Sequence, residues 1–330
     1  PGVGCRFAPR CWMASERCKT ESPKLTEVEP GHFVSCFYAD KASANSSLAK
    51  KIKGVKKMID VSMDKRVMPA LKIPESQIRK LDITDTERIE RFRTAGYGGN
   101  VSDALWALGI CNTVLSQQFK ALRQGMVLVG RALPVKLHTV VIDSSLGPGG
   151  ESSSYVEDKL NGTEHPQKRM MRCVAESEPG SILCFDCGGD MQPAHFGEMS
   201  CQLAYSHGCR GMLIAGNCRD TQYVLKMPDF PMFSFGTAPN AFGGWIVTDV
   251  NVPIMLPGHL TYYVQVFPGD YVFADNDGAQ IIPKEVIDEV LLRVEEIHTK
   301  ENEQRKALAD GMDIDIPSSV CCKDNYIGMT

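Results

Sequence analysis

The feature that most constrains the fold is an alternation of strand-like and helix-like segments in the middle of the chain. Residues 181–185 and 211–214 are short apolar segments typical of buried strands, and residues 196–206 between them have a helical pattern. Such alternation favours a layered α/β fold, in which helices cover a sheet. The second apolar segment leads into Arg219 and Asp220. We therefore expect two charged side chains at the end of a strand, where α/β proteins commonly keep their sites.

Two helices are expected before this region. Thr84 can cap a helix while Glu87, three residues later, reaches back to complete a capping box. Asn100 is a candidate N-cap for a second helix over residues 101–108. Gly109 follows it, at a position where a left-handed residue commonly ends a helix.

Strands and one long helix are expected elsewhere. Residues 125–142 and 245–266 are rich in valine and other apolar residues, as in strands covered on one or both faces. A helix over residues 283–309 has Pro283 at its start and Gly311 just after its end, which mark both boundaries. The apolar positions on one face of this helix are Val286, Val290, Val294 and Ile297.

One folded domain with extensions at both ends is expected. We assign residues 1–80 to a partly flexible N-terminal extension, residues 81–312 to the folded domain and residues 313–330 to a C-terminal tail. Residues 144–168 combine Gly, Pro, Ser and charged side chains and predict an inserted surface loop. Residues 42–66 are rich in Ser, Ala and Lys, which fits either a solvated segment or a surface for an anionic partner.

The composition argues against several classes of protein. The 36 basic and 40 acidic side chains leave a net charge of -4, so no overall positive field favours nucleic-acid binding. No stretch approaches the roughly 20 apolar residues of a membrane span. The 13 cysteines lack regular spacing, and Cys184 and Cys187 form a lone C-x-x-C, so we expect reduced thiols in a cytoplasmic protein. The N-terminal arginines are mixed with glutamates, which makes a weak organelle-targeting signal.

The candidate site combines the strand end with the helix that precedes it. Gly197 allows close backbone approach, and the free amides of the first helical turn, near Met199 and Ser200, suit a carboxylate. Glu198 lies in the same turn, where it either complements the helix dipole or takes part in chemistry. The arginine–aspartate pair at the strand end also has a simpler alternative, a surface ion pair.

Other polar residues have structural explanations. Asp270, Asp275 and Asp277 do not have the spacing of an EF-hand calcium loop, and a turn followed by a hairpin explains them better. His195 and His207 flank the helix and are candidate general bases. A histidine near a site is more often a packed or hydrogen-bonded structural residue than a catalytic base.

Seven stretches of the chain match a known family in the family's own order. They are VSDALWALG (101–109), GMVLVGRALPV (125–135), AHFGEMSCQLA (194–204), HGCRGMLIAGNCRD (207–220), FPMFSFGTAP (230–239), PGDYVFADNDGAQIIP (268–283) and KENEQRKALADG (300–311). In them the chain resembles the RraA-like family, named after the regulator of ribonuclease activity A. That family includes 4-hydroxy-4-methyl-2-oxoglutarate aldolases, also known as 4-carboxy-4-hydroxy-2-oxoadipate aldolases, and oxaloacetate decarboxylases.

The resemblance implies a fold, an assembly and a reaction. The fold is an RraA-like swivelling β/β/α domain with a central mixed sheet flanked by helices, and the assembly is a homo-oligomer, a trimer or a hexamer. The reaction is carbon–carbon cleavage of small 2-oxo acids, by retro-aldol cleavage or by decarboxylation of oxaloacetate, with Mg²⁺ or Mn²⁺. Both routes pass through a pyruvate enolate, which requires a cation near the forming oxygen and a charged fork for the carboxylate.

The resemblance also implies a role for each acidic and basic site residue. Glu198 precedes the arginine–aspartate pair by twenty intervening residues, the spacing of the family's metal-dependent aldolases. Asp220 resembles the direct metal ligand, and Glu198 resembles the acid that holds a water on the metal. Arg219 resembles the partner of the substrate carboxylate and of the enolate oxygen.

The remaining correspondences concern the backbone and a neighbouring subunit. The backbone at Gly197, Met199 and Ser200 resembles the family's carboxylate-binding turn, and Glu301 resembles an acid contributed by a neighbouring subunit. The chain departs from the aldolases at Ala215, where they commonly have an aspartate. The alternative is a non-enzymatic protein that binds and regulates an RNA-processing enzyme. Methyl transfer would need a glycine-rich loop followed by a ribose-binding acid, and the sequence shows no such pattern.

Overall fold

The chain divides into two compact units, residues 1–65 and residues 66–330. In the first unit, the described residues form helix α1 (Glu16–Thr20) and an antiparallel hairpin of β1 (Thr26–Glu29) and β2 (His32–Val34). The second unit contains the elements that form the candidate site. The computed structural model describes residues 4–5, 8, 14–29, 32–38, 66, 68–139, 166–177, 179–241 and 245–311.

The folded domain includes a segment that the sequence assigned to the N-terminal extension. Leu71 and Ile78 pack against the core of the second unit. The Arg79 guanidinium donates to Glu289 at 2.8 Å, across more than 200 residues of sequence. Residues 66–80 therefore belong to the folded domain, which starts earlier than predicted. Contacts so distant in sequence leave no local pattern, which is why the boundary was misplaced.

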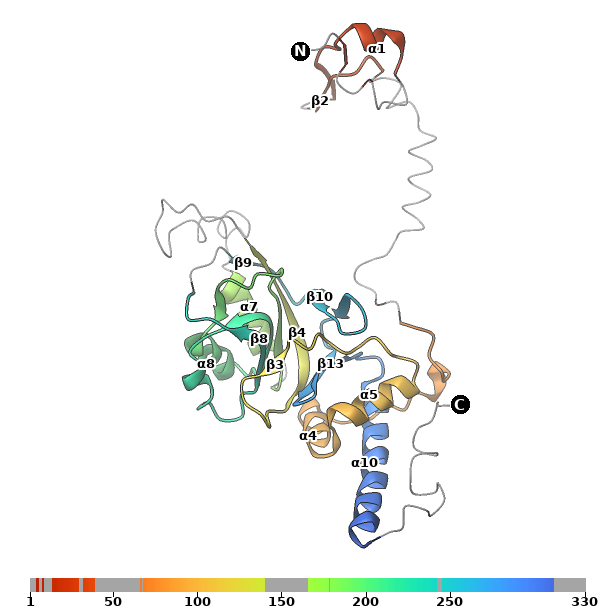
Figure 1. Cartoon of the computed structure of the whole chain (residues 1–330), viewed down its shortest axis with the longest axis vertical. Helices are drawn as coiled ribbons and strands as arrows, with labels where there is room; N and C mark the ends of the chain where they lie inside the picture. The colour runs from red at the N-terminus through yellow and green to blue at the C-terminus, as the bar shows by residue number, and fades with distance from the viewer. Residues whose placement is uncertain are drawn as a thin grey trace. The chain divides into compact units, whose positions relative to one another are not determined.

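A mixed sheet forms the centre of the second unit (Figure 1). Its described strands run in the order β13-β12-β4-β5-β7-β8-β3, with β9 paired to β4 and β6 paired to β7. Neighbours among β4, β5, β7 and β8 are parallel, whereas β3, β9, β12 and β13 pair antiparallel. The expected α/β fold with a central mixed sheet is thus confirmed. The bounds are β3 (Lys120–Ala121), β4 (Leu128–Thr139), β5 (Ile182–Asp186), β6 (Ala194–Phe196), β7 (Met212–Cys218), β8 (Met232–Thr237), β9 (Trp245–Val250), β12 (Tyr271–Asp275) and β13 (Gly278–Ile282), with a separate hairpin of β10 (Ile254–Pro257) and β11 (Tyr263–Val266).

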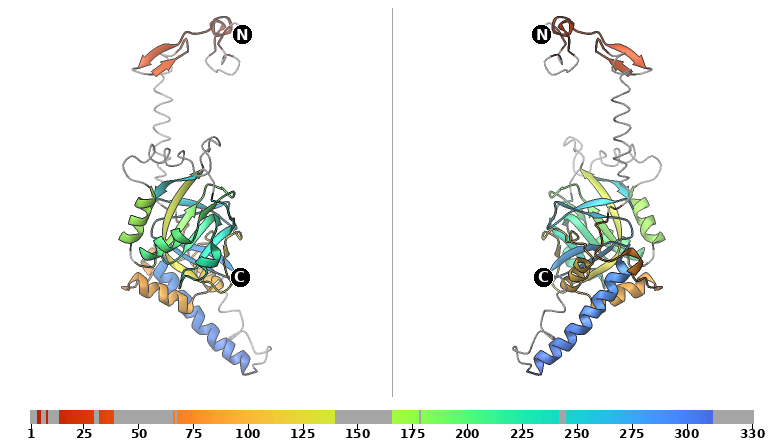
Figure 2. Two further views of the ribbon diagram at one scale, coloured as in Figure 1. Left: turned by 90° about the vertical axis from the view of Figure 1, so that its left-hand side faces the viewer. Right: turned by 90° about the vertical axis from the view of Figure 1, so that its right-hand side faces the viewer.

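Helices flank the sheet in two groups, which lie on different sides of it in Figures 1 and 2. The first group, α4, α5 and α10, contacts β4, β12 and β13. The second group, α7, α8 and α9, is joined by contacts of α8 with its two neighbours, and α7 contacts β4 and β9. The bounds are α4 (Asp85–Ala95), α5 (Gly98–Ala107), α7 (Pro166–Glu176), α8 (Glu198–Ser206), α9 (Thr221–Val224) and α10 (Ile287–Ala309), with a short 3₁₀ helix, η2 (Glu75–Gln77).

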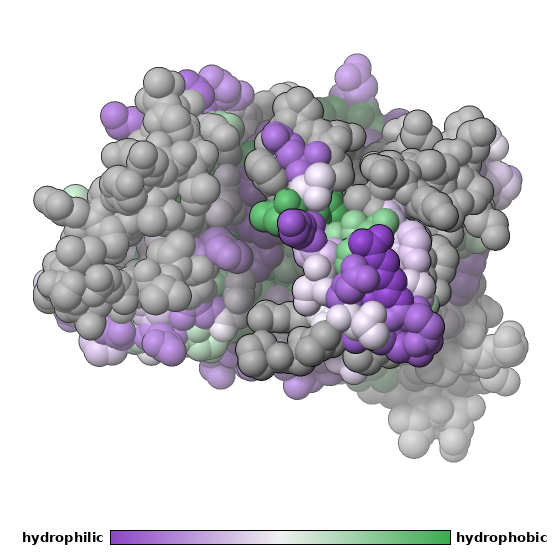
Figure 3. Space-filling model, turned by 90° about the horizontal axis from the view of Figure 1, so that it is seen from above, coloured by the Kyte–Doolittle hydropathy of each residue, from purple (hydrophilic) through white to green (hydrophobic). Residues whose placement is uncertain are grey.

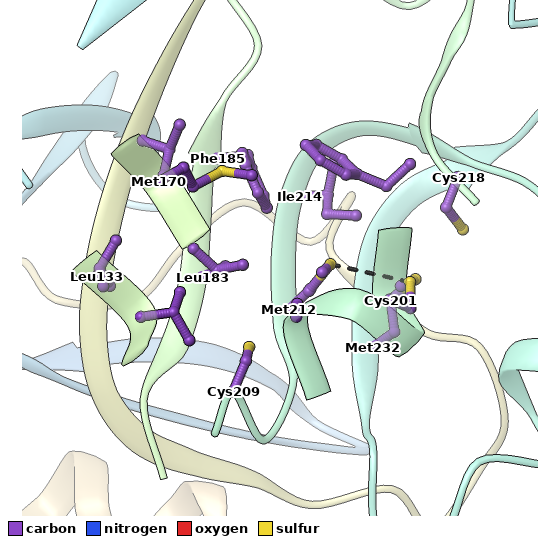
Figure 4. Packing of buried hydrophobic residues seen from close by; sticks show 14 of the residues in the cluster. Leu133, Met170, Leu183, Phe185, Cys201, Cys209, Met212, Ile214, Cys218 and Met232 are labelled. Carbon is purple, nitrogen blue, oxygen red and sulfur yellow. Dashed lines mark hydrogen bonds between the residues drawn. The ribbon is translucent and has the colours of Figure 1, made fainter. Parts of the chain in front are cut away.

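Alternate residues of the central strands point to opposite faces and enter different cores. On β5, Leu183 and Phe185 join the core that packs with α7 and α8, whereas Ile182 and Cys184 join the core on the other face. Figure 4 shows the first of these cores, where methionine and cysteine side chains pack among leucine and isoleucine. Cys187 belongs to that first core. Because Cys184 and Cys187 lie in different cores, the C-x-x-C is neither a redox pair nor half of a zinc site.

Of the two predicted N-caps, Thr84 is confirmed and Asn100 is not. The Thr84 hydroxyl accepts a hydrogen bond from the Glu87 amide at 3.2 Å, as predicted. The prediction for Asn100 is wrong, because α5 begins at Gly98. Asn100 instead caps the helix from within its first turn, by accepting from the Tyr97 amide at 2.9 Å.

The remaining local predictions concern helix ends and the inserted loop. Gly109 and Gly311 have φ angles of 87° and 86°, which confirms them as left-handed residues after helices. The C-terminal helix begins at Ile287 rather than at Pro283, since residues 283–286 form a turn closed by a backbone hydrogen bond. Most of the predicted 144–168 loop lies outside the described residues, and its last three residues belong to α7.

The described surface is consistent with the polar composition. None of the described helices is both long and apolar enough to cross a membrane. On the face shown in Figure 3, hydrophilic side chains predominate among the described residues and hydrophobic ones form small clusters.

Candidate active site

Strand pairing brings the two halves of the candidate site together. β6 and β7 are parallel neighbours, with Phe196 opposite Cys218. The Arg219 amide then donates to the Phe196 carbonyl at 2.9 Å. Parallel strands end at the same edge of a sheet, so the turn after β6 and the turn after β7 meet there. The predicted residues on either side of the intervening helix therefore become neighbours.

Asp220 is held in an unusual backbone conformation. Its φ of 56° and ψ of 28° lie in the left-handed region, which non-glycine residues adopt rarely and often at functional sites. Its Oδ2 atom accepts from the Glu198 amide at 3.3 Å and lies 3.5 Å from Arg219 Nε. The side chains of Arg219 and Asp220 are 41% and 42% exposed. The pair is therefore open to a ligand while a second segment holds it in position.

Gly197 explains how the two turns approach so closely. Its φ of -127° is ordinary extended backbone, so the glycine is not needed for its conformation. A Cβ atom at this position would lie 2.3 Å from Asp220 Oδ2 and 3.2 Å from Arg219 Nε. Only a residue without a side chain leaves room for the carboxylate and the guanidinium.

The N-terminus of α8 presents free amides at the same place. Its first helical hydrogen bond runs from the Cys201 amide to the Gly197 carbonyl at 3.1 Å, so the Met199 and Ser200 amides have no partner within the helix. Both residues are exposed, and the N-cap residue Gly197 offers no side chain to bind their amides. Among the described hydrogen bonds at this end of the helix, the Asp220 carboxylate accepts only from the Glu198 amide. The amides can therefore bind a carboxylate, an interaction that the helix dipole strengthens.

The donors available here restrict the ions that the site could hold. Among the described residues, no group of three or more His, Cys, Asp or Glu side chains could hold a metal ion. Within those residues there is thus no zinc site built only of protein ligands. Asp220 offers an exposed carboxylate, and Glu198 lies half-buried on the adjoining turn. One or two carboxylates beside open surface suit Mg²⁺ or Mn²⁺, because such ions keep several waters.

Glu301 lies in the other helix group, on α10. Its carboxylate accepts from the Tyr97 hydroxyl at 2.6 Å and pairs with Arg305 at 2.8 Å. Burial and the hydrogen bond to Glu301 raise the pKa of Tyr97, so the tyrosine stays protonated as a donor. Among the described residues of one chain, the hydrogen-bond partners of Glu301 are Tyr97, the N-cap of α5, and Arg305 on α10, and not Asp220. Its contribution to a neighbouring subunit stays a prediction.

Both histidines near α8 have structural surroundings. The His195 side chain is fully buried, and burial lowers its pKa. Its ring packs on Gly216, where a Cβ atom would lie 2.7 Å from Nδ1. His207 Nδ1 lies 2.8 Å from the Leu203 carbonyl at the end of α8. A base must reach its substrate, and a fully buried ring does not do so.

The acidic residues near β12 support the hairpin rather than a calcium ion. Asp270 is completely buried, pairs with Arg66 and accepts from the Phe267 amide at 2.8 Å. Asp275 accepts from the Gly98 amide at 2.6 Å and from the Asp277 amide at 3.0 Å. The turn-and-hairpin interpretation is confirmed for these residues.

The sequence analysis missed one residue that supports the site. The Asn217 side chain is almost fully buried and donates to the Met191 carbonyl at 2.6 Å, which anchors the loop that leads into β6. A polar side chain within the apolar strand β7 was the available signal. Ala215, which replaces the aspartate common in aldolases, is buried in the core on the opposite face from the α8 packing.

The fold and the site together define an α/β protein with an exposed helix N-terminus beside an arginine–aspartate pair. The family model described as RraA-like (Aldolase/RraA) matches residues 99–281, just over half of the chain. The chain belongs to this family.

Relatives and solved structures agree with this assignment. A relative from Halalkalibacterium halodurans is 28% identical over 143 residues, which cover 43% of this chain and 65% of the relative. The 4-hydroxy-4-methyl-2-oxoglutarate aldolase of Thermus thermophilus is 29% identical over 116 residues, 35% of this chain and 67% of that enzyme. RraAS2 of Streptomyces coelicolor, an unusual member of the RNase ES inhibitor RraA family, is 20% identical with a TM-score of 0.50, covering 70% of this chain and 100% of that protein. At that identity the structural match shows the fold alone.

Proposed function

We propose that this chain is a divalent-metal-dependent lyase that cleaves carbon–carbon bonds in small 2-oxo acids. The observation that carries the proposal is the close approach at Gly197, which holds the Asp220 carboxylate and the Arg219 guanidinium beside free helical amides. A plain surface ion pair would not require a glycine in a neighbouring segment. The aldolase name of the Thermus thermophilus relative supports the reaction class.

Each residue has a task in this reaction. Arg219 binds the substrate carboxylate through its planar fork, and the Met199 and Ser200 amides donate to the same group. Asp220 would hold Mg²⁺ or Mn²⁺, with Glu198 and a neighbouring subunit's counterpart of Glu301 as outer acids. When bound, the ion supplies positive charge that stabilises an enolate.

The carbon–carbon bond to the leaving fragment breaks and its electron pair stays on the pyruvate enolate. The fragment leaves as carbon dioxide from oxaloacetate, or as a second pyruvate from 4-hydroxy-4-methyl-2-oxoglutarate once the substrate's hydroxyl proton has passed to water. A proton from water then completes the first pyruvate.

The direct test is release of pyruvate from oxaloacetate and from 4-hydroxy-4-methyl-2-oxoglutarate, with added Mg²⁺ or with excess chelator. We expect turnover with the metal and its loss with the chelator, because Arg219 alone does not balance the charge of the enolate. Full activity in excess chelator would overturn the proposed mechanism.

Two variants separate the roles of the neighbouring residues. Asp220→Asn keeps the size of the side chain but removes its charge, so metal affinity and turnover should fall together. Arg219→Lys keeps the charge but loses the fork, so metal affinity should persist while turnover falls about tenfold to a hundredfold. Metal affinity is measured by calorimetry with Mn²⁺.

The alternative is a non-enzymatic regulator of an RNA-processing enzyme. The description of the Streptomyces coelicolor relative, a member of an RNase ES inhibitor family, is the observation that supports this alternative. If both variants keep wild-type metal affinity and cleavage, the pair is a surface feature and the regulator is favoured. Inhibition of a ribonuclease by the chain, unchanged in Asp220→Asn, would favour it further.

A further inference from the structure

A groove lies between α7 and α8, apart from the arginine–aspartate pair. Its volume is about 740 Å³, which is in the range of pockets that hold small organic ligands. The groove uses one face of α8, formed by Ser200, Leu203 and the C-cap residue His207, whose spacing of three and four residues places them in a row. α7 forms the other wall. The described lining residues include neither Arg219 nor Asp220.

The interior of the groove is mostly apolar and rich in polarisable groups, with the buried His195 as its polar member. Phe196, Met212 and Trp245 line it from the sheet, and Met170 and Met171 line it from α7. Met170 and Met212 are also part of the buried core, so this wall is continuous with the packed interior. Thioether and aromatic side chains adapt to ligands of varied shape. The groove therefore suits an alkyl or aryl group.

Charge is distributed unevenly around the groove. Lys168 and Arg172 are exposed and lie one turn apart on α7. The described lining residues contain no acidic side chain, and Glu176, the acid near Arg172, lies 3.9 Å from it. On the opposite wall, Ser200 contributes a hydroxyl. An anionic group at this rim would meet the Lys168 ammonium, and no acidic side chain is among the described lining residues.

We propose that the α7–α8 groove is a binding site for an amphiphilic organic anion, with an alkyl or aryl body and a single carboxylate. The apolar body lies against the methionine and aromatic wall, and the carboxylate lies beside Lys168. Charge complementarity selects this ligand over a neutral apolar molecule. The groove shares Ser200 with the proposed lyase site, but its described lining includes neither Arg219 nor Asp220, so the proposal does not rest on the lyase chemistry.

The test uses anilinonaphthalene sulfonate, a fluorescent aryl anion, titrated into the full chain and then displaced with octanoate. Ala175→Trp fills the groove from an exposed position on α7, and Ala309→Trp adds the same side chain at an exposed position on α10. We expect Ala175→Trp to weaken binding by at least about tenfold, or about 1.4 kcal/mol. Ala309→Trp should bind like the wild type.

A second pair of variants tests the charged rim. Lys168→Glu should weaken binding about threefold to tenfold and make it less sensitive to salt, whereas Lys300→Glu, exposed on α10, should not. The proposal is overturned if Ala175→Trp binds the dye like the wild type or if octanoate does not displace it. It is also overturned if Ala175→Trp changes only the sedimentation coefficient, because the groove is then a contact between copies of the chain.

Discussion

The two helix groups are attached to the same sheet in different ways. In the group of α4, α5 and α10, the Arg88 guanidinium is almost buried and binds Asp85 at 2.7 Å and Asp288 at 2.8 Å. In the same group Glu289, with 2% of its side chain exposed, receives hydrogen bonds from Arg79. Charged side chains from two segments distant in sequence, residues 79–88 and residues 288–289, are thus joined at hydrogen-bond distance.

The group of α7, α8 and α9 is attached mainly by apolar and sulfur-containing side chains. Its core contains Cys201, Met212 and Met232, and burial raises the pKa of the Cys201 thiol, which therefore stays protonated and unreactive. The described ion pairs here are longer, such as 3.5 Å between Arg219 and Asp220.

The comparison shows where this protein is fixed and where it can adapt. A buried ion pair has a defined geometry and is costly to break on one side only, so the α4–α5–α10 group acts as a rigid support. A core rich in methionine repacks more easily, and both the candidate active site and the α7–α8 groove belong to that side. The position of Asp220 there depends on backbone pairing and on Gly197 rather than on salt bridges.

Removing residues 66–80 is the most severe way to disturb the rigid side. A protein lacking residues 1–80 loses both the Arg79–Glu289 contact and the Arg66–Asp270 contact, whereas one lacking residues 1–65 keeps them. We expect the shorter protein to be less stable by more than about 5 kcal/mol, since buried Asp270 loses Arg66 and buried Glu289 keeps only Arg293 of its two arginine partners. Urea denaturation of the two truncated proteins measures the difference. Equal stability would show that this segment is dispensable.

Breaking a single buried contact should have the next largest effect. Asp288→Ala leaves the Arg88 guanidinium partly unpaired and the Leu81 amide without its acceptor, so it should cost about 3–5 kcal/mol of unfolding free energy. Glu303→Ala, at an exposed position of the same helix, should cost less than about 0.5 kcal/mol. A small loss for Asp288→Ala would mean that the support is less rigid than the contacts indicate.

On the adaptable side, Gly197→Ala should damage function more than stability. The added methyl group displaces the Asp220 carboxylate, whose side chain can move into solvent at little cost. Turnover should fall about a hundredfold, as expected when a reacting group is misplaced by about 1 Å, while the urea midpoint changes little. Gln202→Ala, exposed on α8, is the control. A large loss of stability together with activity would contradict the division between the two sides.

Glu289 should make the rigid side sensitive to acid. Burial by itself raises the pKa of Glu289, but hydrogen bonds from Arg79 and Arg293 prevail and lower that pKa from 4.5 to about 2. Because the folded-state pKa is depressed, the stabilisation is complete above pH 4.5 and is lost as the pH falls from there toward 2. Stability should fall by on the order of 2 kcal/mol more in the wild type than in Glu289→Gln over this range. Glu296→Gln, whose exposed side chain binds the same arginine, should behave like the wild type.

The elements of the fold follow from local sequence to a large extent. The periodic segments located the strands β5 and β7, the helix α8 and the C-terminal helix, because periodicity and end residues are local properties. A predicted helix start was wrong where a side chain caps the helix from within it. The Asn100 side chain lies in the first turn of α5 and accepts from the Tyr97 amide, three residues earlier. The short helix α9 after Asp220 has too few residues to leave a periodic signal.

The sequence by itself determined which groups are available for the proposed chemistry: Arg219, Asp220, Glu198 and the glycine that precedes it. Only the tertiary structure decided that they meet, since the pairing of β6 with β7 brings Gly197 against the Asp220 carboxylate. It also decided that residues 66–80 belong to the domain, through ion pairs to α10. The physical reason is the same in both cases. Burial and ion pairing depend on distances in space, and residues that are far apart in the chain come together only when the sheet has formed.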